Sequence, residues 1–279
     1  MSARRAVEGP EIGGDALNEL LSSRLIELRE TAPPGFAVRV VRPFVVASDE
    51  PMSALTQRID RVLEPAIAWL EQTYFRDEPS DVVAIWLCAD AASYDRTARD
   101  LTGFPPSTPF GFYSEEHRSV VLDASTGDGT IVHEILHPLL RADFAACPTW
   151  LDEGLGAMYE RCAFEGGALR GLVNWRLEAL RRAAAERRVP TVAALFRMTP
   201  EEFYGDDSAL NYAAARYLCL FLQERGALAE LYRRLRDAGP PAGDPAMVAE
   251  KAVADLLGAP GVAEVDTAFR AWVMRLSAG

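Results

Sequence analysis

Apolar residues recur at intervals of three and four along most of the second half of the chain, which is the spacing of one face of an α-helix. From Pro148 this pattern continues almost to the C-terminus and predicts an almost wholly helical region. The last segment shows it as a single stripe, made of Val262, Val265, Phe269, Trp272 and Leu276. In the first half, the same spacing predicts helices over 15–30 and 52–75 and a short one over 93–101.

Other runs in the first half predict strands. The stretch FAVRVVRPFVVAS, residues 36–48, alternates well enough for one or two strands, with a break or bulge at Pro43. The apolar run DVVAIWLCA at 81–89 predicts a buried strand. GFYSEEHRSVVLDAS at 111–125 predicts a hairpin with a polar turn around 115–118.

Strands mostly in the first half and helices mostly in the second indicate an α+β fold. The residues PPG at 33–35 end the first helix and begin a linker. We therefore expect an N-terminal helical extension over 1–35 and one domain over 36–279. Within that domain, we expect a strand-rich lobe over 36–125 and a helical lobe over 126–279.

Composition and charge narrow the class of protein. Hydrophobic residues make up 49% of the 279 residues and charged residues 25%, which is ordinary for a globular protein. The net charge of −12 argues against a nucleic-acid partner, because binding phosphates needs a basic surface. No apolar run is long enough for a membrane helix. The N-terminus has no apolar core after its two Arg, so we expect no signal peptide and a cytoplasmic protein, although a leader removed before residue 1 would leave the same sequence.

The four cysteines are Cys88, Cys147, Cys162 and Cys219, and none forms a C-x-x-C pair. A zinc knuckle or a thioredoxin-like site is therefore not expected. Cys147 and Cys162 flank a predicted helix, whose length would hold them roughly 22 Å apart, beyond the reach of a disulfide. We expect all four to be buried free thiols.

The stretch TIVHEILH, residues 130–137, carries the most specific chemical signal. The chain has only three His, and two of them, His133 and His137, stand four residues apart with Glu134 directly after the first. On a helix this spacing puts both imidazoles on nearly the same face, about 6 Å apart along the axis. H-E-x-x-H is a recurrent zinc site in which the Glu serves as general base. The plain alternative is two unrelated surface histidines.

Two histidines do not hold a catalytic zinc, so a third protein ligand is needed. His117, the remaining His, lies in the predicted hairpin turn, which is a poor place for a rigid ligand. The segment TWLDEGLGAMYE offers Glu153 and Asp152 instead. Fifteen residues separate Glu153 from His137, enough for a loop and a second helix packed alongside the first. Asp152 is the competing ligand, or an acceptor for a His N–H.

TIVHEILH followed by TWLDEGLGAMYE resembles the gluzincin metallopeptidases, and within them the bacterial peptidase MA-like group. GFYSEEHRSVVLD before the motif and LNYAAARYLCLFLQERG after it fit the same group, so the resemblance covers 36–276. It implies a zincin-like fold, Zn²⁺ held by His133, His137 and Glu153, and a peptide or protein substrate. It also implies that Glu134 is the general base and Tyr212 the oxyanion donor, with a half-buried aromatic like Tyr217 or Tyr204 as the alternative for Tyr212. The strand SVVLDA would be the edge strand that pairs with the substrate, with an interior strand as the alternative.

The chain departs from these peptidases in three ways. Pro138 follows His137 directly, so we expect the helix to kink or loosen there. The spacing to Glu153 is short, and the G-x-M-E-N segment that anchors a substrate amino terminus is missing, with Glu115 in GFYSE as a weak substitute. Three hypotheses follow: a zinc peptidase, a zinc-binding regulatory module with little or no hydrolysis, or a helical scaffold with a coincidental motif. The sequence specifies neither the cleavage preference nor the oligomeric state.

Overall fold

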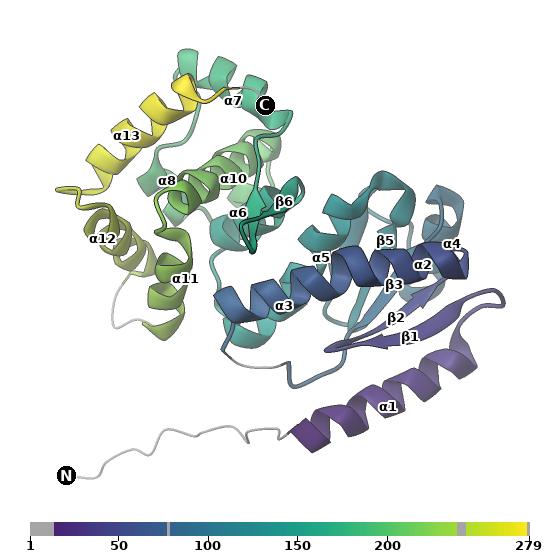
Figure 1. Cartoon of the computed structure of the whole chain (residues 1–279). Coiled ribbons are helices and arrows are strands. Elements are labelled where there is room, and N and C mark those ends of the chain that lie inside the picture. The colour runs from purple at the N-terminus through teal and green to yellow at the C-terminus, as the bar shows by residue number, and fades with distance from the viewer. Residues whose placement is uncertain (1–13, 77–78, 239–243, 278–279) are drawn as a thin grey trace, which may run out of the picture.

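A five-stranded mixed sheet forms the centre of the N-terminal half in the computed structural model, which describes residues 14–76, 79–238 and 244–277 (Figure 1). The helices of the C-terminal half gather beside it. Strands therefore precede most of the helices, and the α+β prediction is confirmed at this level. The sheet holds the strands in the order β1-β2-β3-β5-β4.

The strands pair as a mixed set. Of the one or two strands predicted for 36–48, two form, β1 (Ala37–Val41) and β2 (Phe44–Ser48), with the predicted break at Pro43. They pair as an antiparallel hairpin. Then β3 (Ala84–Cys88) lies parallel to β2, and β5 (Ser119–Asp123) lies parallel to β3. The last strand in the sheet, β4 (Gly111–Ser114), runs antiparallel to β5 and forms the edge.

The expectation that SVVLDA forms the edge strand is wrong. All five residues of β5 are buried, and the strand has a neighbour on each side, whereas β4 is only half-buried beyond its first residue. A continuous apolar run such as Val120–Leu122 suits a strand covered on both faces. The hairpin itself was predicted, but its other arm lies at the edge.

Helices cover both faces of the sheet. On one face, α1 (Gly14–Thr31) and α4 (Ala91–Thr102) contact alternate strand residues such as Val45, Ala47 and Trp86. The helix expected over 15–30 is therefore present, and Figure 1 shows it packed beneath the sheet. Residues 1–13 of the expected extension lie outside the described residues.

The opposite face packs against α5 and against one continuous helical stretch. That stretch consists of α2 (Met52–Arg58), a π-helical turn η1 (Ile59–Leu63) and α3 (Glu64–Thr73), and it matches the predicted helix over 52–75. After β5, a short 3₁₀ turn, η2 (Ala124–Thr126), leads into α5 (Asp128–Asp143). Pro138 does not end α5, which continues for five more residues.

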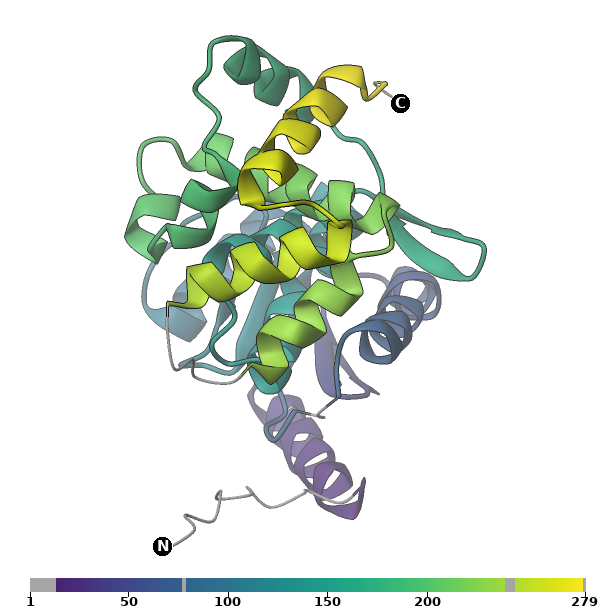
Figure 2. The same ribbon diagram turned by 90° about the vertical axis from the view of Figure 1, so that its left-hand side faces the viewer.

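The C-terminal half is built around two helices, α6 (Thr149–Tyr159) and α10 (Ser208–Glu224), which pack closely on each other. The other elements surround this pair (Figure 2). They are β6 (Cys162–Glu165), β7 (Ala168–Gly171), α7 (Arg176–Ala185), α8 (Val192–Arg197), α9 (Pro200–Phe203), α11 (Leu228–Asp237), α12 (Pro245–Leu257) and α13 (Val262–Arg275).

The β6–β7 hairpin corrects the expectation of an almost wholly helical second half. It projects from the body of the molecule as a separate two-stranded sheet (Figure 2). Gly166 and Gly167 form its turn with φ values of 59° and 81°. Positive φ at both central positions is what a tight hairpin of the right twist requires, and glycine adopts it without strain. The Gly-Gly pair therefore allows the tight turn between β6 and β7.

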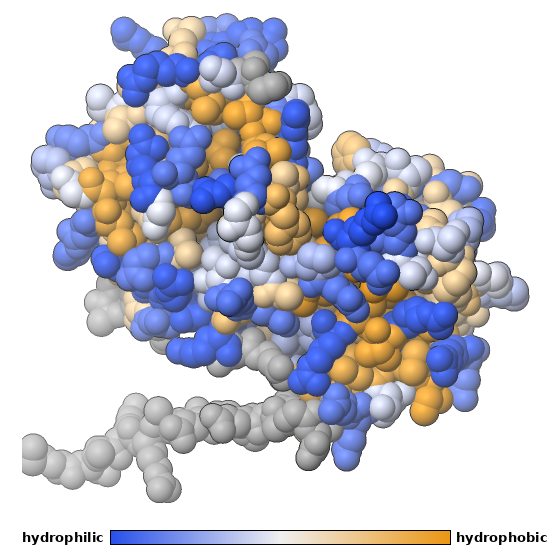
Figure 3. Space-filling model, in the orientation of Figure 1, coloured by the Kyte–Doolittle hydropathy of each residue, from blue (hydrophilic) through white to orange (hydrophobic). Residues whose placement is uncertain are grey.

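Two expectations from composition can be compared with the structure. All four cysteines are free, as expected, but only Cys88 and Cys219 are buried, whereas Cys147 and Cys162 are partly exposed. Among the described residues, no helix is both long and apolar enough to cross a bilayer. The face shown in Figure 3 carries hydrophilic and hydrophobic residues side by side.

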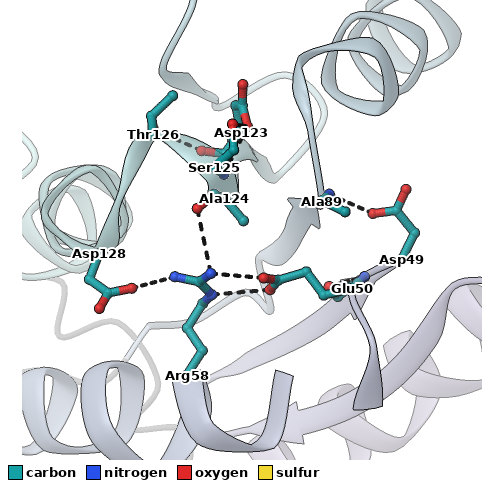
Figure 4. A network of polar contacts seen from close by, with 10 residues as sticks. Asp49, Glu50, Arg58, Ala89, Asp123, Ala124, Ser125, Thr126 and Asp128 are labelled. Carbon is teal, nitrogen blue, oxygen red and sulfur yellow. Dashed lines mark hydrogen bonds and ion pairs between the residues drawn. The ribbon is translucent and has the colours of Figure 1, made fainter. Parts of the chain in front are cut away.

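An ion pair fixes the start of α5 (Figure 4). Arg58 of α2 contacts Asp128, the first residue of α5, and its Nη2 donates to Oε1 of Glu50 at 2.8 Å. The same guanidinium reaches the carbonyl of Ala124 in η2 at 3.5 Å. These contacts join α2, the end of β2 and the first turn of α5.

A second and more deeply buried ion pair fixes the other end of α5. The side chain of Asp143 is fully buried, and its Oδ2 accepts hydrogen bonds from Nη1 of Arg236 at 2.9 Å and from the hydroxyl of Tyr232 at 2.8 Å. Its Oδ1 accepts from the backbone N–H of Arg76 at 2.7 Å. The last turn of α5 is thus tied both to α11 and to the segment after α3.

We predict that Asp143→Ala destabilises the protein by about 3–5 kcal/mol, because it removes the buried anion that Arg236 and the Tyr232 hydroxyl share and leaves Arg236 only the exposed Asp237. Denaturant unfolding followed by circular dichroism measures this. The control is Asp95→Ala, which removes an exposed partner of Arg99 on α4 and should leave the unfolding midpoint almost unchanged. Equal midpoints for the two variants would contradict the structural role given to Asp143.

Candidate metal centre

Two helices bring three potential metal ligands together. His133 and His137 stand on successive turns of α5, with their ring centroids 5.0 Å apart. Glu153 reaches them from α6. One donor atom from each of these residues lies within 4.8 Å of the other two, and the group as a whole is largely buried. It could hold a metal ion.

Glycines allow α6 to come this close. A Cβ on Gly156 would lie 2.9 Å from Nε2 of His133, and one on Gly154 would lie 2.8 Å from Sγ of Cys219 on α10. A Cβ on Gly129, in the first turn of α5, would overlap the carbonyl oxygen of Glu160 at 1.8 Å. No larger side chain fits at these places without moving a helix. The glycines in WLDEGLG therefore seat α6 between α5 and α10.

Carboxylates on α6 and just beyond it face both imidazole rings. Nδ1 of His137 lies 2.7 Å from Oδ1 of Asp152, within hydrogen-bond distance. Nδ1 of His133 lies 3.3 Å from Oε1 of Glu160 but makes no hydrogen bond among the described residues. An ionised carboxylate only accepts hydrogen bonds, so Nδ1 of His137 carries the proton. In the neutral ring, Nε2 then keeps its lone pair for a metal. Asp152, considered above as a ligand or as an acceptor, contacts His137 in this second way.

The two carboxylate oxygens of Glu153 differ in their hydrogen bonds. Oε1 accepts the hydroxyl proton of Tyr204 at 2.5 Å. Oε2 is buried, accepts no hydrogen bond among the described residues, and lies 3.5 Å from Nε2 of His133. A buried carboxylate oxygen without a partner is costly, and a cation beside it would remove the cost. Two imidazoles and a carboxylate are a common donor set for zinc, and imidazole also suits other divalent transition metals.

The charges of the group compensate one another. Burial opposes protonation of His133, but the carboxylates of Glu153 and Glu160 outweigh it and raise its pKa well above the usual value. Burial also works against the charge of Glu153, yet its contacts with His133, His137 and Tyr204 lower its pKa to about 2. Without metal, the site therefore favours an imidazolium beside a carboxylate. A metal that binds there must displace a proton.

A cavity of about 270 Å³ opens onto this group. Glu134 lines it and is 9% exposed, and burial raises its pKa above the usual value. Tyr212 lines it from α10, where burial and the nearby Glu153 raise the pKa of its phenol, so that it remains a hydrogen-bond donor. The structure thus places His133, Glu134, His137, Glu153 and Tyr212 around one cavity.

Strand β4 forms one wall of the cavity through Gly111, Phe112 and Tyr113. A Cβ on Gly111 would lie 3.3 Å from Cγ of Glu134 and 2.5 Å from Cδ2 of Leu122, so the glycine lets the edge strand pass directly beside the carboxylate. The exposed edge of the sheet therefore borders the candidate site.

Two residues weighed at the sequence level lie elsewhere. His117 sits in the β4–β5 turn, where its Nδ1 is 2.9 Å from Oγ of Ser114, and the potential ligand group does not include it. Glu115 is in the same turn, and its Oε2 lies 3.5 Å from Nε of Arg141. Neither residue lines the cavity.

Sequence reasoning missed three residues of the site: Tyr204, Glu160 and Arg141. Glu160 follows Glu153 by seven residues, or two helical turns, and this spacing could have revealed it. Arg141 follows Glu134 by seven on α5 in the same way. Tyr204 comes from the end of α9, fifty-one residues after Glu153, and no local spacing indicates it.

Comparison of the chain with models of known protein families gave no match, and comparison with curated proteins gave no significant match either.

We predict that Glu153→Ala lowers the affinity for zinc by more than the 10- to 100-fold that is typical for loss of a residue that only supports a ligand. Competition with a chromophoric chelator measures the dissociation constant. Glu178→Ala on α7, which removes a largely exposed carboxylate, is the matched control and should leave the affinity unchanged. If Asp152→Ala abolished zinc binding while Glu153→Ala did not, Asp152 would be the ligand.

Proposed function

We propose that this chain is a zinc-dependent peptidase with a zincin-like fold. One observation carries the proposal: the buried group of His133, His137 and Glu153 lies at a cavity, with Glu134 beside it and the edge strand β4 along the wall. This is the combination that hydrolysis of an extended peptide needs. The resemblance to gluzincins in TIVHEILH and TWLDEGLGAMYE supports the same reaction.

His133, His137 and Glu153 would hold the metal and leave a fourth position for water or substrate. Zinc bound there supplies Lewis acidity, which polarises a carbonyl and lowers the pKa of a bound water. The three residues come from two helices, α5 and α6, which approach closely at Gly156 and are joined by the contact between His137 and Asp152. The ligands are therefore held in place before a substrate arrives.

Glu134 is placed to move the proton. Its side chain leaves α5 about 100° around the helix from His133, so it flanks the ligand group without joining it. Burial raises its pKa toward the range in which a carboxylate is an effective base near neutral pH. In this proposal Glu134 takes a proton from the attacking water and delivers it to the leaving amine.

Strand β4 provides the surface for the substrate. As an edge strand it has backbone groups that no other strand in the described part of the chain pairs. The N–H and the carbonyl of Gly111 contact the hydroxyl of Thr108, which a peptide paired at Gly111 would have to displace. An extended peptide can add to such an edge through main-chain hydrogen bonds. Because Gly111 lies next to Glu134, a peptide paired with β4 passes the proposed general base.

We predict that Glu134→Gln folds and binds zinc like the parent but cleaves no peptide measurably, because the amide keeps the shape and loses the base. Metal analysis and cleavage of a peptide library are compared for both proteins. Equal cleavage by both would remove Glu134 from the mechanism. A zinc-loaded parent that cleaves nothing in the library, or in unfolded protein, would instead favour a zinc-binding module without hydrolysis.

Tyr212 is the proposed hydrogen-bond donor to the developing oxyanion. Tyr212→Phe should keep zinc affinity and lower the cleavage rate roughly 10²- to 10³-fold, which is the scale for losing one such donor. Tyr204→Phe is the matched comparison: it removes the hydrogen bond that holds Glu153 and should weaken zinc binding. An unchanged rate in Tyr212→Phe would mean that its hydroxyl takes no part in the reaction.

A further inference from the structure

We propose that Arg141 makes this site selective for peptides that carry a carboxylate about 10 Å from the reacting bond, which is the length of two turns of α5. The inference rests on the proposed function, because it assumes that a peptide lies in the cavity beside β4. It adds a substrate class, acidic peptides, and a residue that selects them.

Arg141 shares the reactive face of α5. It follows Glu134 by seven residues, which brings it back to within about 20° of the same direction and about 10 Å further along the axis. It follows His137 by one turn. Like these two residues, Arg141 lines the cavity. Its guanidinium therefore lies on the floor of the same groove, beyond the ligand group.

The edge strand runs along this face of α5 in the same direction. At one end Gly111 lies against Glu134, and at the other end the β4–β5 turn brings Glu115 to within 3.5 Å of Arg141. Tyr113 lines the cavity between these two points. A peptide paired with β4 that has its scissile bond at Glu134 would extend over Arg141 about three residues away, since a strand advances about 3.3 Å per residue.

The charge of Arg141 is unlike that of its surroundings. Among the described residues that line the cavity, it is the one Arg or Lys, and Glu134, Asp152 and Glu153 carry carboxylates. Those carboxylates already face imidazoles or the Tyr204 hydroxyl. The whole chain has a net charge of −12, which repels acidic peptides at long range. A preference for an acidic peptide must therefore come from a local cation.

The guanidinium is available to a ligand. Its Nη1 donates to the carbonyl of Ala145 at 2.9 Å and its Nε faces Glu115, while the side chain stays 47% exposed. Glu115 is itself 68% exposed, so this ion pair is weak and exchangeable. A substrate carboxylate can take the place of Glu115 and form the paired hydrogen bonds that Arg favours with carboxylates. Glu115 then acts as a competitor that occupies Arg141 when the groove is empty.

Two parts of a peptide can supply this carboxylate: an Asp or Glu side chain, or the C-terminal carboxyl group. The direction of pairing with β4 decides between them, because it sets which end of the peptide lies over Arg141. The chemistry recognised at Arg141 is the same for both.

Binding to zinc-loaded Glu134→Gln protein tests the proposal without cleavage of the probe. The probes are short labelled peptides of one sequence: a neutral form with blocked ends, forms with one Gln replaced by Glu at successive positions, and a form with a free C-terminal carboxyl. We expect one acidic form to bind about tenfold more tightly than the neutral one, the low end for a hydrogen bond to a charged group. Fluorescence anisotropy gives the dissociation constants.

Variants of Arg141 in the same background separate charge from packing. Arg141→Gln should remove the difference between the acidic and neutral peptides, and Arg141→Lys should keep part of it. Arg99→Gln, at an exposed ion-paired Arg on α4, is the control and should keep all of it. Glu115→Gln should widen the difference by removing the competitor. Equal binding of all peptides to the Glu134→Gln protein, or a preference that survives Arg141→Gln, would overturn the proposal.

The outcomes also separate this proposal from the proposed function. Carboxylate-dependent binding without cleavage by the zinc-loaded parent would leave Arg141 selective and remove the peptidase activity. Cleavage with no carboxylate preference would do the reverse. Binding of no peptide at all to the zinc-loaded protein would overturn both.

Discussion

Paired imidazoles and carboxylates occupy the narrow space between α5 and α6, and this buried pairing is the interaction on which the rest of the site depends. A buried charge without a partner costs several kcal/mol, so each ionisable group there needs a neighbour of the right kind. Asp152 and Glu160 face the two imidazoles, and Tyr204 binds one oxygen of Glu153. The other oxygen of Glu153, Oε2, has no hydrogen-bond partner among the described residues, and a bound metal ion would supply one.

The surrounding fold holds this pairing rigid. Both ends of α5 are fixed by ion pairs, one with Arg58 and one with Arg236, so the helix that carries both histidines has little freedom to tilt. The sheet packs against the same helix and presents β4 beside it. Stability and chemistry are separated along α5: the ion pairs at its ends serve the fold, and the face that carries His133, Glu134 and His137 lines the cavity.

Much of this arrangement could be predicted from the sequence where the signal is local. The H-E-x-x-H spacing identifies His133, Glu134 and His137, because four residues make one helical turn. The order of the elements up to α6 and the hairpin around 115–118 also follow from local patterns. The position of a strand within the sheet does not follow from local patterns, and the buried run in β5 was the clue that it lies inside.

Contacts between distant segments were beyond prediction from spacing. Tyr204 forms its hydrogen bond with Glu153 only because α9 packs against α6. No local sequence pattern near either residue indicates this contact. The Gly-Gly pair of the β6–β7 hairpin can be seen in the sequence, but the helical spacing of apolar residues before and after it predicts helices on both sides. Arg141 and Glu160 could have been predicted from spacing, because each stands two helical turns after a residue that the sequence analysis identified, Glu134 and Glu153 respectively.

Gly156 has a meaning for other chains as well as for this one. Its hydrogen faces the ring of His133, where a methyl group would overlap three ring atoms at 2.9 to 3.1 Å. Any relative that keeps both histidines but carries Ala or a larger residue there must have turned the first imidazole or shifted the second helix. Such a chain would keep the H-E-x-x-H spacing without the ligand geometry seen here. A glycine three residues after the acidic ligand, as Gly156 is after Glu153, therefore marks sequences whose two helices can approach as closely as they do here.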